Sequence, residues 1–335
     1  MRFPRVKAEG RSFYHCISRV VEGRFIFESS SAGGCSEAER FLWLLRRLEA
    51  FSGIRVLTYA LMANHFHLLC EVPQAQALSQ DQVLERIKAG YGSARVQAVR
   101  EQLARMAEQP DASEQSRRLL EPYRRRMNDI SIFIKELKGR FAQWYNRRHG
   151  RYGVLWAERF KSVLLEGGQA LATVGAYIDL NPVRAGLCED PKDYRYCGYG
   201  EALAKGSPEL HRGLGTILEL PQTSSWKEIS RQYRKHLFLT GSLASNNKPA
   251  AFELARAKQV VEQQQGQLSP QERLHCKIRY FSEGVILGSR SFVQTHFERL
   301  KQKIGYKAKS GPTCLKILGS DSLWAFRNLR VRTFG

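Results

Sequence analysis

Two histidines, two residues apart, are the first residues of this sequence that could do chemistry. His65 and His67 open a short apolar stretch, and another apolar stretch precedes them across Met62-Ala63-Asn64. Side chains alternate between the faces of a β-strand, so both imidazoles are expected on one face and Phe66 on the other. Two imidazoles on one face can share a metal ion, which needs a further ligand from elsewhere in the chain. The alternative is a half-exposed strand end without a metal.

A helix predicted over residues 171–181 could supply what the histidines lack. Its apolar spacing indicates a buried stripe formed by Leu171, Val174 and Ile178. Pro182 is expected to end it. Tyr177 and Asn181 are four residues apart, so they should lie on one face about one turn from each other. The tyrosine offers a hydroxyl nucleophile, and the asparagine offers a neutral oxygen ligand.

Four short motifs occur in order along the first part of the chain. They are Met62-Ala-Asn-His-Phe-His67, Phe141-Ala-Gln-Trp-Tyr-Asn-Arg-Arg-His149, Gly153-Val-Leu-Trp-Ala-Glu-Arg-Phe-Lys161 and Tyr177-Ile-Asp-Leu-Asn-Pro182. Together they resemble the HUH single-tyrosine transposases and, within that family, the REP-associated tyrosine transposase-like branch. The resemblance covers roughly residues 9–200.

That resemblance implies a metal-dependent DNA transposase that cleaves and rejoins single-stranded DNA at hairpin-forming sequences. Tyr177 would form a 5′-phosphotyrosine link, while His65, His67 and Asn181 would hold one Mg²⁺ or Mn²⁺ ion. The active unit would be a monomer or a homodimer, without a nucleotide cofactor. Two alternatives stay open: a DNA- or RNA-binding protein without catalysis, and a metal phosphoesterase that uses water in place of the tyrosine.

An excess of positive charge independently indicates a polyanionic partner. The formal net charge is +21 over 335 residues, and nucleic acid is the usual partner of so basic a chain, a generic basic surface being the alternative. The excess is densest over residues 123–161, with eleven Lys and Arg against three Asp and Glu. Aromatic residues are interleaved there, as binding of single strands requires, although each ring taken singly fits a core position better. The candidate DNA-binding residues are Arg140, Arg147, Arg148, Arg159 and Lys161.

Cysteine spacing and hydropathy argue against several other classes of protein. The seven cysteines form no C-x-x-C pair and their number is odd, which disfavours a zinc ribbon and a disulfide scaffold. No apolar run approaches the ~18 residues of a membrane span, and the sequence has no Walker loop or dinucleotide fingerprint. A cytoplasmic, nucleoid-associated protein with no membrane partner is expected.

Predicted strands and helices would bring the chemical residues together. Hydrophobic periodicity predicts, in order, strand 13–21, helix 36–51, two strands within 57–73, helix 130–148 and strand 154–166. This order is the split βαβ arrangement of a ferredoxin-like (RRM-like) antiparallel sheet, an α+β fold with helices on one face and the histidine strand in the interior.

The predicted strands also assign faces to one basic pair and to a third histidine. Arg159 and Lys161 should share one face of the last strand, where they could reach phosphates. His15 lies on the same face of the first strand as Phe13 and Ile17, so we expect a core histidine or one that supports the metal ligands, not a ligand itself.

The chain is predicted to divide near residue 205. Residues 1–205 would form the catalytic domain, interrupted by a polar helical insertion at about 74–126. Residues 206–335 would form a mostly α-helical region, with one helix over 250–267 and further helical spacing over 278–304. This region is a candidate DNA-binding module, such as a helix-turn-helix, or an oligomerisation module.

Overall fold

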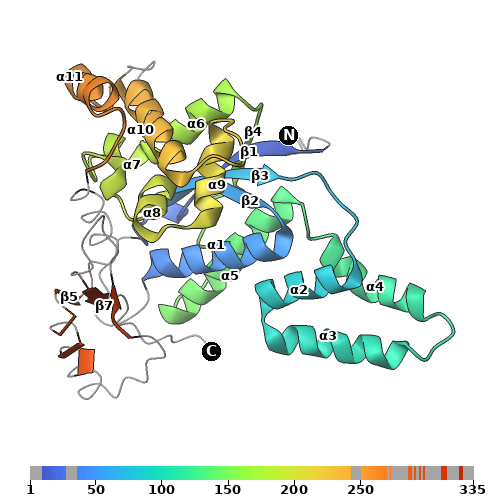
Figure 1. Ribbon diagram of the computed structural model, residues 1–335. Coiled ribbons are helices and arrows are strands. Elements are labelled where there is room, and N and C mark those ends of the chain that lie inside the picture. Colours follow the sequence, from blue (N-terminus) through green and yellow to red (C-terminus); the bar gives the residue numbers. More distant parts are fainter. Residues whose placement is uncertain are drawn as a thin grey trace.

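A four-stranded antiparallel sheet in the order β2-β3-β1-β4 is the centre of the protein (Figure 1). The computed structural model describes residues 10–27, 36–242 and 250–269, with shorter pieces between residues 272 and 326. The strands are β1 (Ser12–Arg19), β2 (Arg55–Met62), β3 (His65–Val72) and β4 (Lys161–Leu165). Helix α1 (Glu37–Ser52) follows β1, and α5 (Ile130–Arg148) precedes β4. This is the split βαβ order, so the predicted ferredoxin-like α+β fold is confirmed.

The first helical layer, α1 and α5, packs against the face of the sheet that carries Phe66. Ser36 caps α1, because its hydroxyl accepts the Glu39 N–H at 3.3 Å while the Glu39 carboxylate accepts the Ser36 N–H at 3.1 Å. The Phe41 ring of α1 lies 5.0 Å from Phe66 and 5.4 Å from Phe141 of α5, centroid to centroid. These buried rings fix both helices on the sheet. Phe66 therefore points away from the face of the two histidines, as strand alternation predicts.

A second helical layer covers the opposite face of the sheet, although helices were predicted on one face only. Of this layer, only the helix over 171–181 was predicted within the catalytic domain. It consists of α6 (Gln169–Asp179), α7 (Asn181–Arg184), α8 (Gly198–Lys205), α9 (Pro208–Ile217) and α10 (Trp226–Ser242). Helices α6 and α9 contact β2, and α10 packs on both of them (Figure 1). Gly213 allows the approach of α9, because a Cβ at this position would lie 2.5 Å from the Leu57 carbonyl oxygen. β2 is consequently buried from Val56 to Met62.

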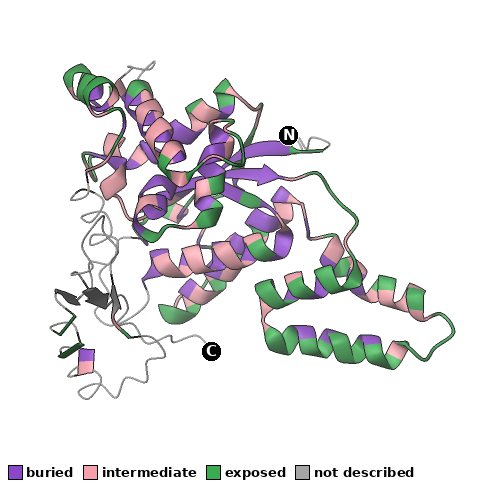
Figure 2. Ribbon diagram, in the orientation of Figure 1, coloured by how far each residue is buried: buried purple, intermediate pink, exposed green. Residues whose placement is uncertain are grey.

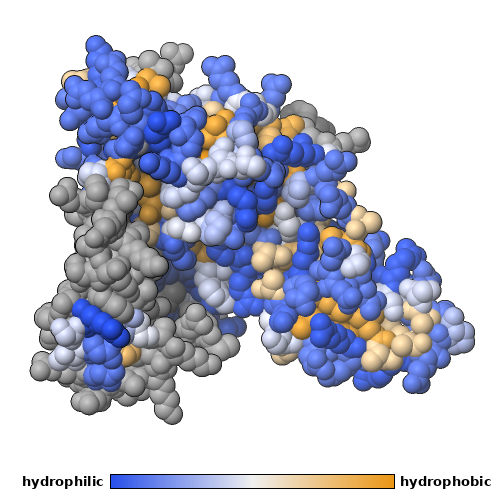
Figure 3. Space-filling model, in the orientation of Figure 1, coloured by the Kyte–Doolittle hydropathy of each residue, from blue (hydrophilic) through white to orange (hydrophobic). Residues whose placement is uncertain are grey.

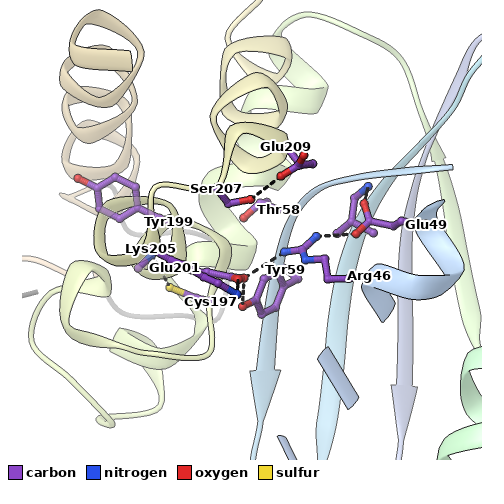
Figure 4. Close-up of polar contacts among 12 residues, drawn as sticks. Arg46, Glu49, Thr58, Tyr59, Cys197, Tyr199, Glu201, Lys205, Ser207 and Glu209 are labelled. Carbon is purple, nitrogen blue, oxygen red and sulfur yellow. Dashed lines mark hydrogen bonds and ion pairs between the residues drawn. The ribbon is translucent and has the colours of Figure 1, made fainter. Parts of the chain in front are cut away.

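Both helical layers are tied to the outer edge of β2. The Leu61 N–H donates to the Tyr196 carbonyl at 2.9 Å, so the chain before α8 covers this edge. In α8, the Glu201 carboxylate accepts a hydrogen bond from the Tyr59 hydroxyl at 2.7 Å and one from Arg46 of α1 at 3.0 Å (Figure 4). A buried carboxylate thus links the second layer to the sheet and to the first layer.

β4 begins later than predicted. A strand was expected over 154–166, but the residues before Lys161 contact the end of β1 without forming a regular strand. Trp156 forms an isolated bridge with Val20, and the Ala157 N–H donates to the Arg19 carbonyl at 3.0 Å. The regular ladder resumes only at Lys161, so the prediction is wrong for the residues that precede it.

The predicted polar insertion is a helical unit with a small core of its own. It contains α2 (Gln80–Tyr91), α3 (Ser93–Met106) and α4 (Ala112–Arg124). Its apolar residues form a separate cluster, and Phe51 of α1 belongs to that cluster and joins it to the body. The outward faces are exposed, and apolar side chains are visible only between hydrophilic ones (Figures 2 and 3). The three helices and their exposed outward faces agree with an insertion of helices, one of the two forms that a polar segment of this kind can take.

The core of the sheet extends past residue 205, where a division was predicted. Leu214 of α9, Tyr233 of α10 and Val260 belong to the same buried cluster as the sheet. The helix expected over 250–267 is shorter, with α11 at Leu254–Lys258 and a π-turn at Gln259–Gln263. Within the described residues, none of the helices has the length and hydropathy that crossing a bilayer would require.

Three short strands form a second sheet near the end of the chain, in the order β5-β7-β6. They are β5 (Ile286–Gly288), β6 (Thr313–Cys314) and β7 (Trp324–Phe326). Helical spacing was expected across 278–304, which is wrong at Ile286–Gly288 because these residues pair with β7. Most of that predicted helical module lies outside the described residues.

Candidate active site

Strand register places three histidines on one face of the sheet. In the β1–β3 ladder, Arg19 is opposite His65 and Ile17 is opposite His67. Residues directly opposite each other point to the same face, as do residues two apart on one strand. His15 therefore joins His65 and His67 on this histidine face, the face covered by α6. His15 and His67 are buried, and His65 is half-buried.

The two candidate metal ligands each have their Nδ1 atom engaged. His65 Nδ1 lies 2.7 Å from Asn64 Oδ1, and the Asn64 amide is oriented by donating its own N–H to the Gly23 carbonyl at 3.0 Å. His67 Nδ1 lies 2.9 Å from His15 Nε2. When Nδ1 carries the proton in both rings, the lone pair lies on Nε2, which is the arrangement that metal-binding histidines use.

The electrostatic surroundings favour neutral imidazoles. Burial lowers the pKa of His15 to about 4, so its Nε2 can accept a hydrogen bond at neutral pH. Burial, together with the nearby Arg19 guanidinium, also lowers the pKa of His65. A neutral imidazole is the form that binds metal. His15 is buried and contacts His67, so it occupies the position expected of a core histidine or of one that supports the candidate ligands.

Tyr177 reaches the histidine face from the helix above it. Its ring centroid lies 6.0 Å from that of His67 and 6.2 Å from that of His15, in edge-to-face arrangements. The Arg184 guanidinium lies 5.3 Å from the Tyr177 ring centroid, so a cation is close to the phenol. The structure therefore brings together the histidine pair and the candidate nucleophile, which are more than 100 residues apart in the sequence.

Asn181 lies one turn beyond Tyr177, where α7 begins. Its amide N–H groups donate to the Tyr177 carbonyl at 3.0 Å and to the Ile178 carbonyl at 3.3 Å. These bonds run to α6 and not to either histidine, and they leave the amide oxygen on the side away from those carbonyls. Two imidazole nitrogens and one amide oxygen are a donor set that suits a divalent transition-type ion. In the described part of the chain, no three His, Cys, Asp or Glu side chains form a metal-binding group.

Cations on the exposed part of the histidine face come from β1 and β4. Ile17 is opposite His67 on one side and Lys161 on the other, so these three residues form one row across the sheet. The Lys161 side chain is 73% exposed, and its nearest acid is Glu158 at 3.9 Å. Arg19 is exposed beside His65. The sequence analysis missed Arg19, although its alternation with His15 and Ile17 was a usable signal.

The three candidate arginines of α5 lie on the opposite side of the sheet from the histidines. Arg140 pairs with Glu136 at 3.1 Å, and Arg148 lies 3.4 Å from Glu37 of α1. Arg147 is exposed near the end of the helix. Arg159 is also exposed, but it precedes β4 and does not share a strand face with Lys161. Of the five predicted DNA-binding residues, only Lys161 is placed by strand register on the histidine face.

Tryptophans and arginines alternate along this first helical layer. The Arg40 guanidinium lies 4.2 Å from the Trp43 ring centroid and 5.6 Å from that of Trp144. Arg47 extends the series beyond Trp43 at 4.7 Å, and Arg148 extends it beyond Trp144 at 5.4 Å. A stacked guanidinium group can still bind phosphate through its edge, but the Nε and Nη1 atoms of Arg40 are buried, and Arg47 Nε donates to the Ala89 carbonyl at 3.3 Å. Trp144 packs on the core and also contacts the Arg40 and Arg148 guanidinium groups.

Comparison with known proteins gives likeness to solved structures but no relative by sequence. No family model matches the chain, and no curated protein matches it either. A solved structure of a REP-associated tyrosine transposase bound to a REP hairpin aligns with 62% of this chain and 89% of that chain, at a TM-score of 0.39 and 11% identity. We base the proposal below on the residues of the site and not on this likeness.

Proposed function

We propose that the protein cleaves and rejoins single-stranded DNA with Tyr177 as the nucleophile, acting next to hairpin-forming sequences. The observation that carries the proposal is the position of the Tyr177 ring, 6.0 Å from His67 and 6.2 Å from His15 on one face of the sheet. Neither the basic surface nor a binding-only role requires a tyrosine at this place. The net charge of +21 supports a polyanionic substrate.

The chemistry follows from a tyrosine attacking a phosphodiester. The Tyr177 hydroxyl gives its proton to solvent, its oxygen bonds to phosphorus, and the bond from phosphorus to the 3′-oxygen breaks. The 3′-oxygen takes up a proton, which leaves a free 3′-hydroxyl and a 5′-phosphotyrosine link. A second 3′-hydroxyl can reverse these steps and join two strands, because the link conserves the energy of the original bond.

Phenol ionisation is the barrier that the surroundings of Tyr177 must lower. An unperturbed tyrosine has a pKa of ~10, so only about 0.1% is ionised at neutral pH. Arg184, 5.3 Å from the ring centroid, places positive charge beside the phenol ring. The Arg184 guanidinium also lies 3.4 Å from the Tyr177 carbonyl, which holds the two residues together.

His65, His67 and Asn181 are the residues that would hold a divalent cation, Mg²⁺ or Mn²⁺. When bound, such an ion would polarise the scissile phosphate and stabilise charge on the departing oxygen. The protein's own part is to orient both imidazoles, through Asn64 and His15. The amide of Asn181 is oriented by its bonds to α6.

DNA phosphates would be bound on both sides of the sheet. Lys161, with Arg159 before it, would contact the strand near the histidine face. Arg140, Arg147 and Arg148 would contact a second segment of DNA along the first helical layer, where guanidinium groups and indoles alternate. In this proposal, the DNA strand that is cut binds on the histidine face. The DNA segment that is only held binds along the first helical layer.

A denaturing gel tests the proposed reaction. Purified protein is incubated with labelled DNA hairpins from the flanks of its own gene and with Mg²⁺ or Mn²⁺, beside the Tyr177→Phe protein. We expect a protease-sensitive, protein-linked band that the variant lacks, while hairpin binding is unchanged. Nicking that persists in Tyr177→Phe would instead identify a phosphoesterase that uses water, and binding without nicking in either protein would identify a binding protein.

A further inference from the structure

Asp179 is a fully buried carboxylate two residues after Tyr177 and two residues before Asn181, and nothing in the reaction above uses it. Its side chain is 0% exposed. It accepts hydrogen bonds from the Tyr233 hydroxyl at 2.6 Å, from the Thr58 hydroxyl at 2.9 Å and from the Tyr199 N–H at 3.1 Å. One carboxylate therefore joins α6 to strand β2, to α8 and to α10.

Burying this group is costly, and no charge of opposite sign offsets the cost. Among the residues that the structure describes, no lysine or arginine pairs with Asp179. Burial raises the pKa of its carboxyl to about 6, although the hydrogen bonds from Tyr233, Tyr199 and Thr58 oppose that rise. An apolar side chain would avoid the desolvation cost altogether. Unlike an apolar side chain, the carboxylate forms three directional hydrogen bonds to three different elements.

The position of Asp179 on its helix shows what those bonds control. Successive residues of an α-helix are rotated by about 100°, so residues two apart point in roughly opposite directions. Tyr177 faces the histidines of β1 and β3, whereas Asp179 lies on a different side of α6, toward Thr58 of β2 and toward α8 and α10. The three bonds consequently set the rotation of α6 about its own axis. At the ~6 Å outer radius of a helix, a rotation of about 20° moves a side-chain atom by about 2 Å.

The donors reach Asp179 from well-anchored surroundings. Thr58 belongs to β2 and lies against α8, because a Cβ on Gly198 would be 2.1 Å from its hydroxyl oxygen. Tyr199 and Thr58 lie near the Glu201 and Tyr59 cluster that fixes α8 to the sheet (Figure 4). Tyr233 is fully buried in α10, a helix from beyond the residues that carry the four motifs.

We propose that Asp179 is the positioning residue for Tyr177, and that through it α8 and α10 are parts of the active-site scaffold. This inference rests on the proposed function, because it assigns Tyr177 as the reacting group. Asp179 itself touches neither DNA nor the histidines in this scheme. It holds α6 at the rotation that presents the phenol, and a misplacement of about 1 Å can lower a rate by roughly 100-fold.

A pair of matched variants tests the proposal. Tyr233→Phe removes the hydroxyl bound to Asp179, and Tyr59→Phe removes an equally buried hydroxyl bound to Glu201. We expect Tyr233→Phe to lower the rate of covalent protein–DNA formation at saturating hairpin by about tenfold or more, with hairpin affinity within twofold of the unmodified protein. Tyr59→Phe should leave that rate within twofold, although both variants should lower the melting temperature similarly.

Rescue and refutation are read from the same assay. Asp179→Asn keeps one acceptor oxygen, so it should retain more of the rate than Asp179→Ala, in a folded protein by circular dichroism. Equal rates for Tyr233→Phe and Tyr59→Phe would overturn the positioning role. If the unmodified protein forms no covalent product, the proposed function fails. In that case, amide hydrogen exchange of residues 171–178 tests whether Asp179 fixes α6. Unchanged exchange in Tyr233→Phe would show that it does not.

Discussion

Replacing His15 by leucine should weaken metal binding while the rest of the site stays in place. His15 is 6% exposed and His67 is 5% exposed, and the bond between their nitrogens is 2.9 Å long. Without His15, the Nδ1–H of His67 would lose the acceptor that now lies 2.9 Å away, and removing the acceptor of a buried donor costs about 1–3 kcal/mol. The metal-free protein avoids this cost by moving the proton to Nε2, but that tautomer has no lone pair for the metal. The full cost therefore falls on the metal-bound state.

Converted to an affinity, 1–3 kcal/mol is roughly a 5- to 150-fold increase in the dissociation constant. Binding of Mn²⁺ should be followed by electron paramagnetic resonance in the absence of DNA, and the Mn²⁺ concentration for half-maximal cleavage should shift in parallel. His149→Leu is the control, because His149 is exposed and contacts Glu37 at 3.1 Å on the other side of the sheet. An unchanged Mn²⁺ affinity in His15→Leu would refute the assignment of the His67 tautomer and of the histidine metal site.

Four further predictions concern binding, stability and assembly. Lys161→Gln should flatten the salt dependence of single-strand binding by ~0.7 in the log–log slope, and an unchanged slope would remove Lys161 from the interface. Gly213→Ala should destabilise the protein by about 1–3 kcal/mol in denaturant unfolding, because its Cβ would meet the β2 backbone at 2.5 Å. Gly139→Ala, with nothing within 4 Å of the added Cβ, should stabilise it by roughly 0.5–1 kcal/mol. Mixing Tyr177→Phe with His67→Ala protein should restore no covalent product, because Tyr177 lies beside the histidines of its own chain; recovered product would show exchange of α6 between subunits.

Local sequence patterns were sufficient to predict the strands and helices that carry or support the candidate reacting groups. Alternation in β3 placed His65 and His67 on one face and Phe66 on the other, because a strand has a period of two wherever it pairs. The apolar spacing of α1 and α5 marked both helices closely. The order of these elements then led to the ferredoxin-like sheet, since few other topologies accommodate it.

Long-range contacts explain what the sequence could not show. The late start of β4 depends on how residues before Lys161 pair with the end of β1, which no periodicity encodes. The second helical layer forms because β2 has apolar residues on both faces, a pattern that does not say which helices will cover it. Asp179 appeared only as part of a motif, and its three donors come from residues 58, 199 and 233.

The edges of the sheet restrict the path that a DNA strand can follow. The histidines and the arginines of α5 lie on opposite faces, so DNA that contacts both must go around the sheet. The β2 edge is covered by the chain at Tyr196. Within the described residues, β4 pairs only with β1, and its Val163 and Leu164 side chains are 50% and 39% exposed. A continuous strand would therefore turn over β4, where apolar side chains could support bases while Lys161 binds a phosphate at the turn.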